Sequence, residues 1–210
     1  AARQQAEEVV TVLPYMGYAR QDDAFAEGEP ISARAMARAI STGTDRVLTV
    51  NPHEEAVCDF FDVPCTAVDA AGVLADPLPS LSDPLFLSPD EGAIHLAETV
   101  RDAAGAGELD YFEKHRLSDT EVEVRPSDAE TAGRDVVLVD DIVATGSTMS
   151  TAIAQLDAPE RVFVTCVHPM LAANARTKLA QAGVDGVFGT DTIERAVSTV
   201  SVAPALVEHL

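Results

Sequence analysis

Two adjacent carboxylates stand at the end of an apolar run in the stretch "VVLVDDIVATGSTM", residues 136–149. The apolar run predicts a buried strand that ends at Asp140 and Asp141. In open parallel sheets ligands bind beyond the carboxyl ends of the strands, so polar groups at that point carry particular weight. Carboxylates there can accept hydrogen bonds from neighbouring hydroxyls, such as those of a ribose.

A cluster of hydroxyl groups around a glycine follows the carboxylates, and we expect it to begin a helix. Its members are Thr145, Gly146, Ser147 and Thr148. Backbone N–H groups at a helix start, aided by hydroxyls and the helix dipole, form a cradle sized for a phosphate. With the carboxylate pair, the cluster predicts a site for a phosphorylated sugar. It is neither a P-loop nor a dinucleotide-binding glycine motif. The alternative is a strand end followed by an ordinary helix cap.

Polar residues also follow other predicted strands. His53 comes just after a strand at 46–50, and Asp90 comes after one at 84–88. An imidazole and a carboxylate suit a magnesium ion carried on phosphates, held directly or through water. The alternatives are a histidine that simply begins a helix and an aspartate that caps one.

Cations form two further candidate groups. Arg20, Gln21 and Asp22 follow the first predicted strand and offer a cation for phosphate and an amide for the edge of a base. Lys114 and Arg116 alternate along an extended segment and therefore share one side. Two cations there could neutralise charge that develops on transferring phosphoryl oxygens. The alternative for the first group is an ordinary surface turn, and for Lys114 and Arg116 it is a solvated hairpin face.

The chain is strongly acidic. Its 210 residues carry a formal net charge of −21 with an isoelectric point near 4.3. Nucleic acid is therefore a poor partner, because phosphate backbones require a basic surface. The acidic residues are spread along the sequence, which is typical of halophilic proteins, whose self-repulsion is screened by salt. Lysine is almost absent, since only Lys114 and Lys178 accompany twelve arginines.

The remaining composition points to the cytoplasm. No apolar run reaches the length of a membrane span, and no signal peptide opens the sequence. Three cysteines, Cys58, Cys65 and Cys166, show no metal-ligand spacing and leave an odd thiol. A disulfide framework is therefore disfavoured, and the cysteines are expected as small core residues.

Short β-branched runs alternate with alanine-rich amphipathic stretches, which predicts an α/β fold with mainly parallel sheets. A helix is expected at 30–41, with Ile31, Ala35, Ala39 and Ile40 on one face. The segment 63–84, rich in proline and aspartate, is the most linker-like part, and we place a domain boundary there. The part before it holds too few strands for a complete domain. We therefore expect a further segment before Ala1.

Five motifs, in this order and spacing, resemble ribose-phosphate pyrophosphokinase, also called phosphoribosyl-pyrophosphate synthetase. They are "PYMGYARQDDAFAEGEPISA", "NPHEEAVCDFFDVP", "SPDEGA", "EKHRLSDTEVE" and "VLVDDIVATGSTM". The resemblance covers nearly the whole chain and identifies it as an acidic, halophile-type, archaeal member of that family. It implies two phosphoribosyltransferase-like (Rossmann-like) domains with mainly parallel sheets. The first is incomplete, comprising residues 1–65 and a C-terminal return at 192–210, and the second comprises residues 66–191.

The resemblance also implies a reaction and its partners. ATP and ribose 5-phosphate give AMP and 5-phosphoribosyl diphosphate, with Mg²⁺ as cofactor and a homo-oligomer as the working assembly. Lys114 and Arg116 would be catalytic, and His53 and Asp90 would serve the metal. The ATP site would be formed by Arg20, Gln21, Asp22 and His53. The ribose 5-phosphate site would be formed by Arg116, Asp140, Asp141, Ala144, Thr145, Gly146, Ser147 and Thr148.

Two departures from the family pattern and two competing functions accompany this prediction. Many members carry Asp where this chain has Ala144, and "NPH" at 51–53 replaces the commoner Asp-x-His. One competing function is a phosphoribosyltransferase that consumes 5-phosphoribosyl diphosphate, which would share the sugar-phosphate loop but not the other motifs. The second is a non-catalytic subunit associated with an active synthetase, against which Lys114 and Arg116 argue.

Overall fold

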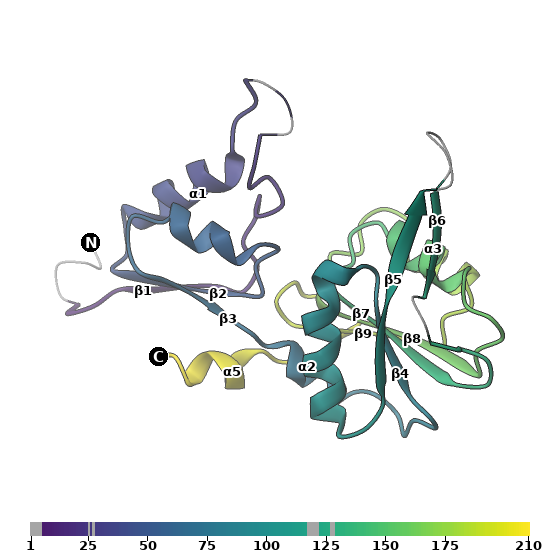
Figure 1. Ribbon diagram of the computed structural model, residues 1–210. Coiled ribbons are helices and arrows are strands. Elements are labelled where there is room, and N and C mark those ends of the chain that lie inside the picture. Colours follow the sequence, from purple (N-terminus) through teal and green to yellow (C-terminus); the bar gives the residue numbers. More distant parts are fainter. Residues whose placement is uncertain (1–5, 25, 27, 117–121, 127–128) are drawn as a thin grey trace. The chain divides into compact units, whose positions relative to one another are not determined.

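The computed structural model describes residues 6–24, 26, 28–116, 122–126 and 129–210, and for 114–116 and 122–126 it describes the backbone alone. The chain divides into two compact units. The first comprises Ala1–Ala70 and Val202–Leu210, and the second comprises Ala71–Ser201. Each unit contains its own sheet, parallel in the first unit and mainly parallel in the second, so the α/β fold class expected from the sequence is confirmed (Figure 1).

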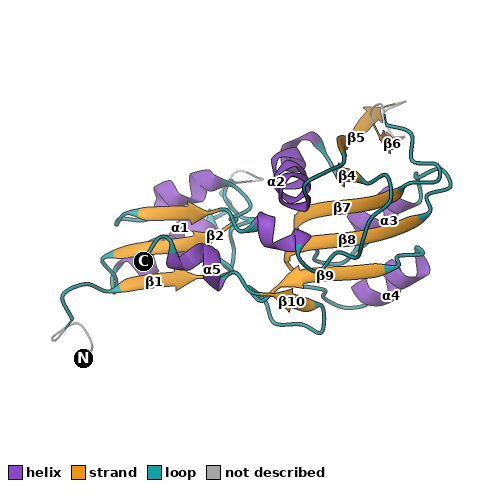
Figure 2. Cartoon of the chain, turned by 90° about the horizontal axis from the view of Figure 1, so that it is seen from below, coloured by secondary structure: helices purple, strands orange, loops and turns teal. Residues whose placement is uncertain are grey.

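The first unit is built on a three-stranded parallel sheet in the order β1-β2-β3. The strands are β1 (Val10–Leu13), β2 (Arg46–Val50) and β3 (Cys65–Val68). Helix α1 (Ser32–Ser41) and the 3-10 helix η2 (Glu55–Phe60) form the connections, and α5 (Ala203–Val207) belongs to the same unit (Figure 2). Parallel pairing brings the ends of β1 and β2 to one edge of the sheet, and the loops that carry Arg20 and His53 begin there.

The face predicted for α1 is wrong in part, because of its four residues only Ile40 packs against the core from within the helix. The helix buries Ala33, Ala37 and Ser41, whereas Ala35 and Ala39 are exposed. Ile31 precedes the helix as its N-cap residue and so belongs to no helical face. Small side chains at positions 33 and 37 let the helix approach a core that includes Met16, Val47, Val57 and Phe61.

The second unit has a seven-stranded sheet in the order β10-β9-β8-β7-β4-β5-β6. All neighbouring pairs are parallel except β5 and β6. Its strands are β4 (Leu85–Ser88), β5 (Glu108–Arg116), β6 (Val122–Pro126), β7 (Asp135–Ile142), β8 (Arg161–His168), β9 (Gly186–Thr190) and β10 (Ser198–Val200). Its α-helices are α2 (Ile94–Ala104), α3 (Ser147–Ile153) and α4 (Ala175–Gln181), and its 3-10 helices are η3 (Ala71–Ala75) and η4 (Glu91–Ala93).

Strand alternation explains how helices cover both faces of this sheet. Leu85, Leu138 and Val164 pack in one cluster with Met149 of α3 and Leu179 of α4. Their neighbours along the strands point to the other face, because side chains alternate with a period of two. Helix α2 contacts β4, β5 and β7 (Figure 2). The central strands are buried on both faces, which explains the nearly continuous apolar runs in the sequence.

The segment at 63–84 is more ordered than its composition predicted. It contains strand β3 and the 3-10 helix η3, and Ala71 and Leu74 are fully buried. The boundary between the two compact units, at residues 70 and 71, also lies within it. Among the residues that the structure describes, no helix has the length and apolar character needed to cross a bilayer.

Candidate active site

The turn between β7 and α3 carries the carboxylates and hydroxyls singled out in the sequence. Strand β7 ends in Asp140, Asp141 and Ile142, and Gly146 is the N-cap of α3 with a left-handed backbone, φ 71°. A side chain at Gly146 would place its Cβ 3.2 Å from the Ala175 carbonyl oxygen. Both the backbone conformation and the close approach of α4 therefore require glycine at this position.

Backbone hydrogen bonds hold this turn against the segment that follows β8. The Val143 N–H donates to the His168 carbonyl at 3.2 Å, and the Leu171 N–H donates to the Val143 carbonyl at 2.9 Å. The Ala172 N–H donates to the carbonyl of Ala144 at 2.8 Å. A loop fixed in this way presents its polar groups without first having to be ordered, which favours ligand binding.

The hydroxyl groups of the turn lie at the surface. Thr145, Ser147 and Thr148 are exposed, and the Thr145 hydroxyl donates to Ser147 Oγ at 3.2 Å. Lys178 Nζ of α4 donates to the same Ser147 oxygen at 2.8 Å. No role was predicted for Lys178 from the sequence, although it is one of only two lysines in the chain. Its contact with the loop joins residues 31 positions apart, so only the fold reveals it.

A group of carboxylates lies beside the turn. The Asp141 N–H donates to Asp140 Oδ1 at 2.9 Å. Burial raises the pKa of the Asp140 carboxyl well above its usual range, and the charges of Asp141 and Asp90 act in the same direction. Asp90 is the N-cap of η4, where its side chain accepts a hydrogen bond from the Ala93 N–H at 3.3 Å. The structure therefore brings Asp90, after β4, close enough to the end of β7 to influence Asp140.

The carboxylates suit a cation that is held mainly by a ligand. Within the described part of the chain, no three His, Cys, Asp or Glu side chains gather closely enough to form a metal site of their own. Magnesium carried on substrate phosphates needs only one or two protein carboxylates and keeps several waters. The negative charge of Asp90 helps to raise the pKa of Asp140, and a cation bound at Asp90 would weaken that effect. The donor set therefore fits Mg²⁺ carried on phosphates.

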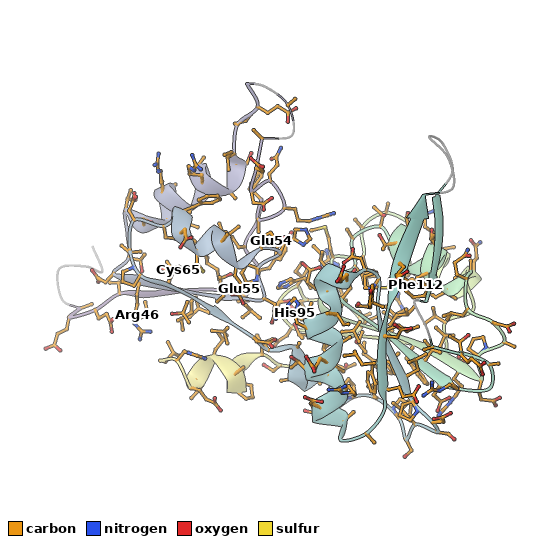
Figure 3. All side chains as sticks on the ribbon, in the orientation of Figure 1. Arg46, Glu54, Glu55, Cys65, His95 and Phe112 are labelled. Atoms are coloured by element: carbon orange, nitrogen blue, oxygen red, sulfur yellow. The ribbon has the colours of Figure 1, made fainter. Side chains whose placement is uncertain are left out.

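The nucleotide candidates lie in the first unit. Arg20 and Gln21 are exposed after β1, Asp22 is half-buried, and His53 is exposed after β2. The two loops start from adjacent parallel strands, so these groups share one edge of the three-stranded sheet. The exposed Glu54 and Glu55, labelled in Figure 3, follow directly after His53.

Asn51 positions the loop that carries His53, a role that the sequence did not suggest. Its side chain donates to Asp69 Oδ1 at 2.8 Å and accepts from the Ala70 N–H at 2.8 Å. Its backbone has φ 32°, a conformation that asparagine tolerates better than most residues. The asparagine of the "NPH" motif therefore ties the end of β2 to the end of β3.

Lys114 and Arg116 lie near the C-terminal end of β5, where this strand pairs with β6. Their backbones pair with those of Val124 and Val122 in an antiparallel register, and both side chains lie outside the described residues. Earlier in the same strand, Phe112 is buried in the core of the second unit (Figure 3). The two cations therefore belong to a strand that begins in the core and continues as part of a two-stranded ribbon at the sheet edge.

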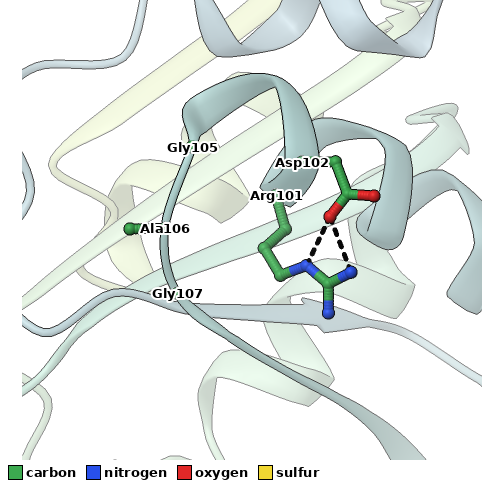
Figure 4. A pocket seen from close by; sticks show the side chains of 5 residues that line it. All are labelled: Arg101, Asp102, Gly105, Ala106 and Gly107. Carbon is green, nitrogen blue, oxygen red and sulfur yellow. Dashed lines mark hydrogen bonds and ion pairs between the residues drawn. The ribbon is translucent and has the colours of Figure 1, made fainter.

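A hollow of about 320 Å³ lies elsewhere in the second unit, at the C-terminal end of α2 (Figure 4). It is lined by Arg101, Asp102, Gly105, Ala106 and Gly107. Arg101 is engaged by the neighbouring Asp102 in an ion pair. The hollow precedes the first residue of β5, so it lies at the amino ends of the parallel strands, where ligands of such sheets do not usually bind.

Comparisons with known proteins give the family. Residues 1–43 match the N-terminal domain of ribose phosphate pyrophosphokinase, and residues 75–204 match the phosphoribosyl transferase domain. The ribose-phosphate pyrophosphokinases of two Halobacterium salinarum strains are 66% identical over 206 residues, which is 98% of this chain and 73% of theirs. The chain belongs to the ribose-phosphate pyrophosphokinase family.

Two further members of the family are also similar to this chain over most of its length. The ribose-phosphate pyrophosphokinase of Methanosarcina mazei is 45% identical over 98% of this chain and 70% of its own length. The crystal structure of phosphoribosylpyrophosphate synthetase from Mycobacterium smegmatis superposes with a TM-score of 0.81 at 30% identity, over 99% of this chain and 72% of that one. The predicted family is confirmed, and the Halobacterium relatives fit the halophilic origin predicted from charge. A phosphoribosyltransferase domain alone would not explain the match at residues 1–43.

Proposed function

We propose that this chain transfers the diphosphoryl group of ATP to the anomeric hydroxyl of ribose 5-phosphate, giving 5-phosphoribosyl diphosphate and AMP. The proposal rests on the family of the chain and on the turn after β7. In this turn Gly146 has a left-handed backbone, and the hydroxyl groups on either side of it are exposed, following the Asp140 and Asp141 carboxylates. A phosphate and a ribose need these two kinds of group side by side.

The sugar phosphate would bind through its two ends. Thr145, Gly146, Ser147 and Thr148 would hold the 5-phosphate with hydroxyls and backbone N–H groups. Asp140 and Asp141 would accept hydrogen bonds from the ribose hydroxyls. Ala144 offers the ribose only its backbone, where many members of the family supply a carboxylate.

Lys114 and Arg116 would act on the group that is transferred. The anomeric oxygen attacks the β-phosphorus of ATP, the bond from that phosphorus to the bridging oxygen of the α-phosphate breaks, and AMP leaves. Negative charge spreads over the phosphoryl oxygens during the transfer, and fixed cations stabilise it. Arg116 would in addition contact the ribose 5-phosphate.

The family resemblance supports roles in binding ATP and its metal. Arg20, Gln21 and Asp22 would contact the nucleotide, His53 would contact both nucleotide and metal, and Asp90 would offer a carboxylate to the metal. When bound, Mg²⁺ would neutralise phosphate charge and orient the diphosphoryl group. The residues of this chain set the positions of the two substrates, on which the rate depends.

The assembly and location of the protein are part of the same proposal. We expect a homo-oligomer, as the family resemblance implies, and size-exclusion chromatography with light scattering would measure its mass. We also expect a cytoplasmic protein, because three free cysteines are typical of a reducing compartment.

The reaction is tested by measuring AMP formation from ATP and Mg²⁺ in multimolar KCl, with and without ribose 5-phosphate. We expect AMP only when ribose 5-phosphate is present. Lys114→Ala should lower kcat by about 10²–10³-fold, the loss seen when one charge-stabilising group is removed. Its midpoint of unfolding should not change. Arg38→Ala is the control, because Arg38 is an exposed cation in the last turn of α1.

The outcomes separate the competing functions. Folded protein that makes no AMP under these conditions would contradict the proposal. If AMP appeared only after an active synthetase was added, and rose with the amount of this chain, a non-catalytic subunit would be the correct interpretation. A Lys114→Ala variant with the wild-type rate would remove Lys114 from the mechanism.

A further inference from the structure

Lys178 contacts the phosphate loop although it lies on a different helix. Its Nζ donates to Ser147 Oγ at 2.8 Å, and the Thr145 hydroxyl donates to the same oxygen at 3.2 Å. A serine hydroxyl accepts two hydrogen bonds and donates one. With both acceptor positions used, the remaining role of the Ser147 hydroxyl is to donate, and an anion is the natural acceptor. Lys178 therefore sets the direction of the Ser147 O–H.

The fold fixes the position of Lys178. Helix α4 begins at Ala175, whose backbone lies against Gly146, and the preceding segment is tied to Ala144 by the hydrogen bond from the Ala172 N–H. Lys178 is one turn further along α4, so it lies on the same side of the helix as Ala175. It is half-buried, whereas Arg176 on the same helix is exposed. This position follows from the same packing that makes Gly146 obligatory.

The carboxylates near the loop explain why a cation would be needed there. The negative charges of Asp141 and Asp90 act on the end of β7, where Asp140 lies, and they oppose the binding of a phosphate dianion there. Arg134 and Arg161 adjoin β7 and β8 at the opposite end of the strands. There Arg134 pairs with Glu108 at 2.6 Å, and Arg161 pairs with Asp135. Among the described residues, Lys178 is the cation that the structure joins to the loop by a hydrogen bond.

We propose that Lys178 is a positioning residue for the 5-phosphate of ribose 5-phosphate, acting through the Ser147 hydroxyl and offsetting the neighbouring carboxylates. The inference rests on the proposed function, because it takes the loop at 144–148 as the phosphate site. It assigns substrate affinity to a residue outside that loop. Lys178 has no part in the diphosphoryl transfer itself, so it should affect KM rather than kcat.

The test compares KM and kcat with each substrate for five variants, which are Lys178→Ala, Lys178→Arg, Ser147→Ala, the double change at both positions, and Arg176→Ala. Lys178→Ala should raise KM for ribose 5-phosphate by about ten- to a hundredfold, the loss expected for one hydrogen bond to a charged group. The KM for ATP and kcat should stay within about twofold of wild type. Lys178→Arg should restore most of the affinity, because it keeps the charge and the donor. Ser147→Ala combined with Lys178→Ala should lose much less than the sum of the two single changes.

Arg176→Ala is the matched control. Arg176→Ala removes the same charge from the same helix. Arg176 lies two residues before Lys178, which places it about 200° from Lys178 around the helix axis. It should leave KM for ribose 5-phosphate unchanged. The affinity for ribose 5-phosphate, measured by calorimetry without ATP, should fall in Lys178→Ala in parallel with the rise in KM. Thermal unfolding of each variant at the same KCl concentration checks that it is folded.

The results that overturn the inference differ from those that overturn the proposed function. Wild-type protein that forms no AMP in the presence of ribose 5-phosphate would contradict the function. Active wild-type protein whose KM for ribose 5-phosphate is unchanged by Lys178→Ala, or changed equally by Arg176→Ala, would contradict the role of Lys178 alone. Strict additivity of the Lys178 and Ser147 changes would also contradict it, because the two side chains would then act independently.

Discussion

Replacing Gly146 by alanine tests whether the turn after β7 binds phosphate. Gly146 has φ 71°, and the added Cβ would lie 3.2 Å from the Ala175 carbonyl oxygen and 3.4 Å from its Cα. Both are backbone atoms of the α4 start, which hydrogen bonds hold against the loop. The helix therefore cannot move away without disturbing those bonds, and the loop has to change shape.

The cost of this substitution has two parts. An alanine in the left-handed conformation costs about 1–2 kcal/mol, and a contact of this kind in a packed region adds about 1–3 kcal/mol. Gly183 supplies a control that separates them. It also has positive φ, 88°, but a Cβ there would meet no atom within 4 Å. Gly183→Ala therefore measures the backbone strain without the contact.

Two assays follow from this comparison. Urea unfolding in multimolar KCl should show a loss of about 1–2 kcal/mol for Gly183→Ala and about 2–5 kcal/mol for Gly146→Ala. Steady-state kinetics should show KM for ribose 5-phosphate raised by about tenfold or more in Gly146→Ala, since a displaced loop loses hydrogen bonds to a charged group. Gly183→Ala should leave that KM unchanged, and neither variant should change KM for ATP.

A folded Gly146→Ala variant that bound ribose 5-phosphate as tightly as wild type would contradict a phosphate site at this turn. The loop would then either tolerate the added methyl group or have no contact with the phosphate. An equal rise in KM for both variants would point instead to a general loss of stability.

Three further predictions concern stability and thiol chemistry. Asp135→Asn should cost about 2–3 kcal/mol, because its fully buried carboxylate accepts from Arg161 Nε at 2.8 Å. Arg161 lowers the pKa of Asp135, so the stability that this carboxylate contributes is present above about pH 4 and is lost as pH falls below it. The unfolding free energies of wild type and Asp135→Asn should therefore converge in acid. A difference between them that stays constant with pH would contradict this. Iodoacetamide should label Cys58 first, because a hydrogen bond from Cys65 lowers its thiol pKa. Cys166 should be labelled last, because it is fully buried, whereas Cys58 and Cys65 are half-buried. Peptide mass spectrometry showing early labelling of Cys166 would contradict this order. The net charge of −21 predicts a midpoint of thermal unfolding that rises with KCl up to multimolar concentrations, and equal stability at low salt would refute a halophilic surface.

Local patterns were sufficient to predict the elements that position the sugar-phosphate turn. Strand β7 is a continuous apolar run, and polar residues directly after such a run have few structural reasons to be there. The start of α3 was predicted from glycine and hydroxyls next to one another. Each of these signals lies within about ten residues, so the sequence displays it without reference to the fold.

Other features depend on contacts that a single stretch of sequence does not contain. The buried face of α1 was mispredicted because alanine suits either side of a helix, and tertiary packing chose Ala33 and Ala37. Strand β3 was hidden in a segment that also contains prolines and aspartates, although its pairing with β2 makes it regular. The clamp formed by Asn51 and the hydrogen bond from Lys178 to the phosphate loop arise only when distant segments meet.

The most direct measurement is a crystal structure of the protein with ribose 5-phosphate. We expect the 5-phosphate at the turn of residues 145–148, within hydrogen-bond distance of Ser147 Oγ, with the ribose hydroxyls toward Asp140 and Asp141. A sugar phosphate bound elsewhere, for example in the hollow beside Arg101, with the turn empty, would contradict it.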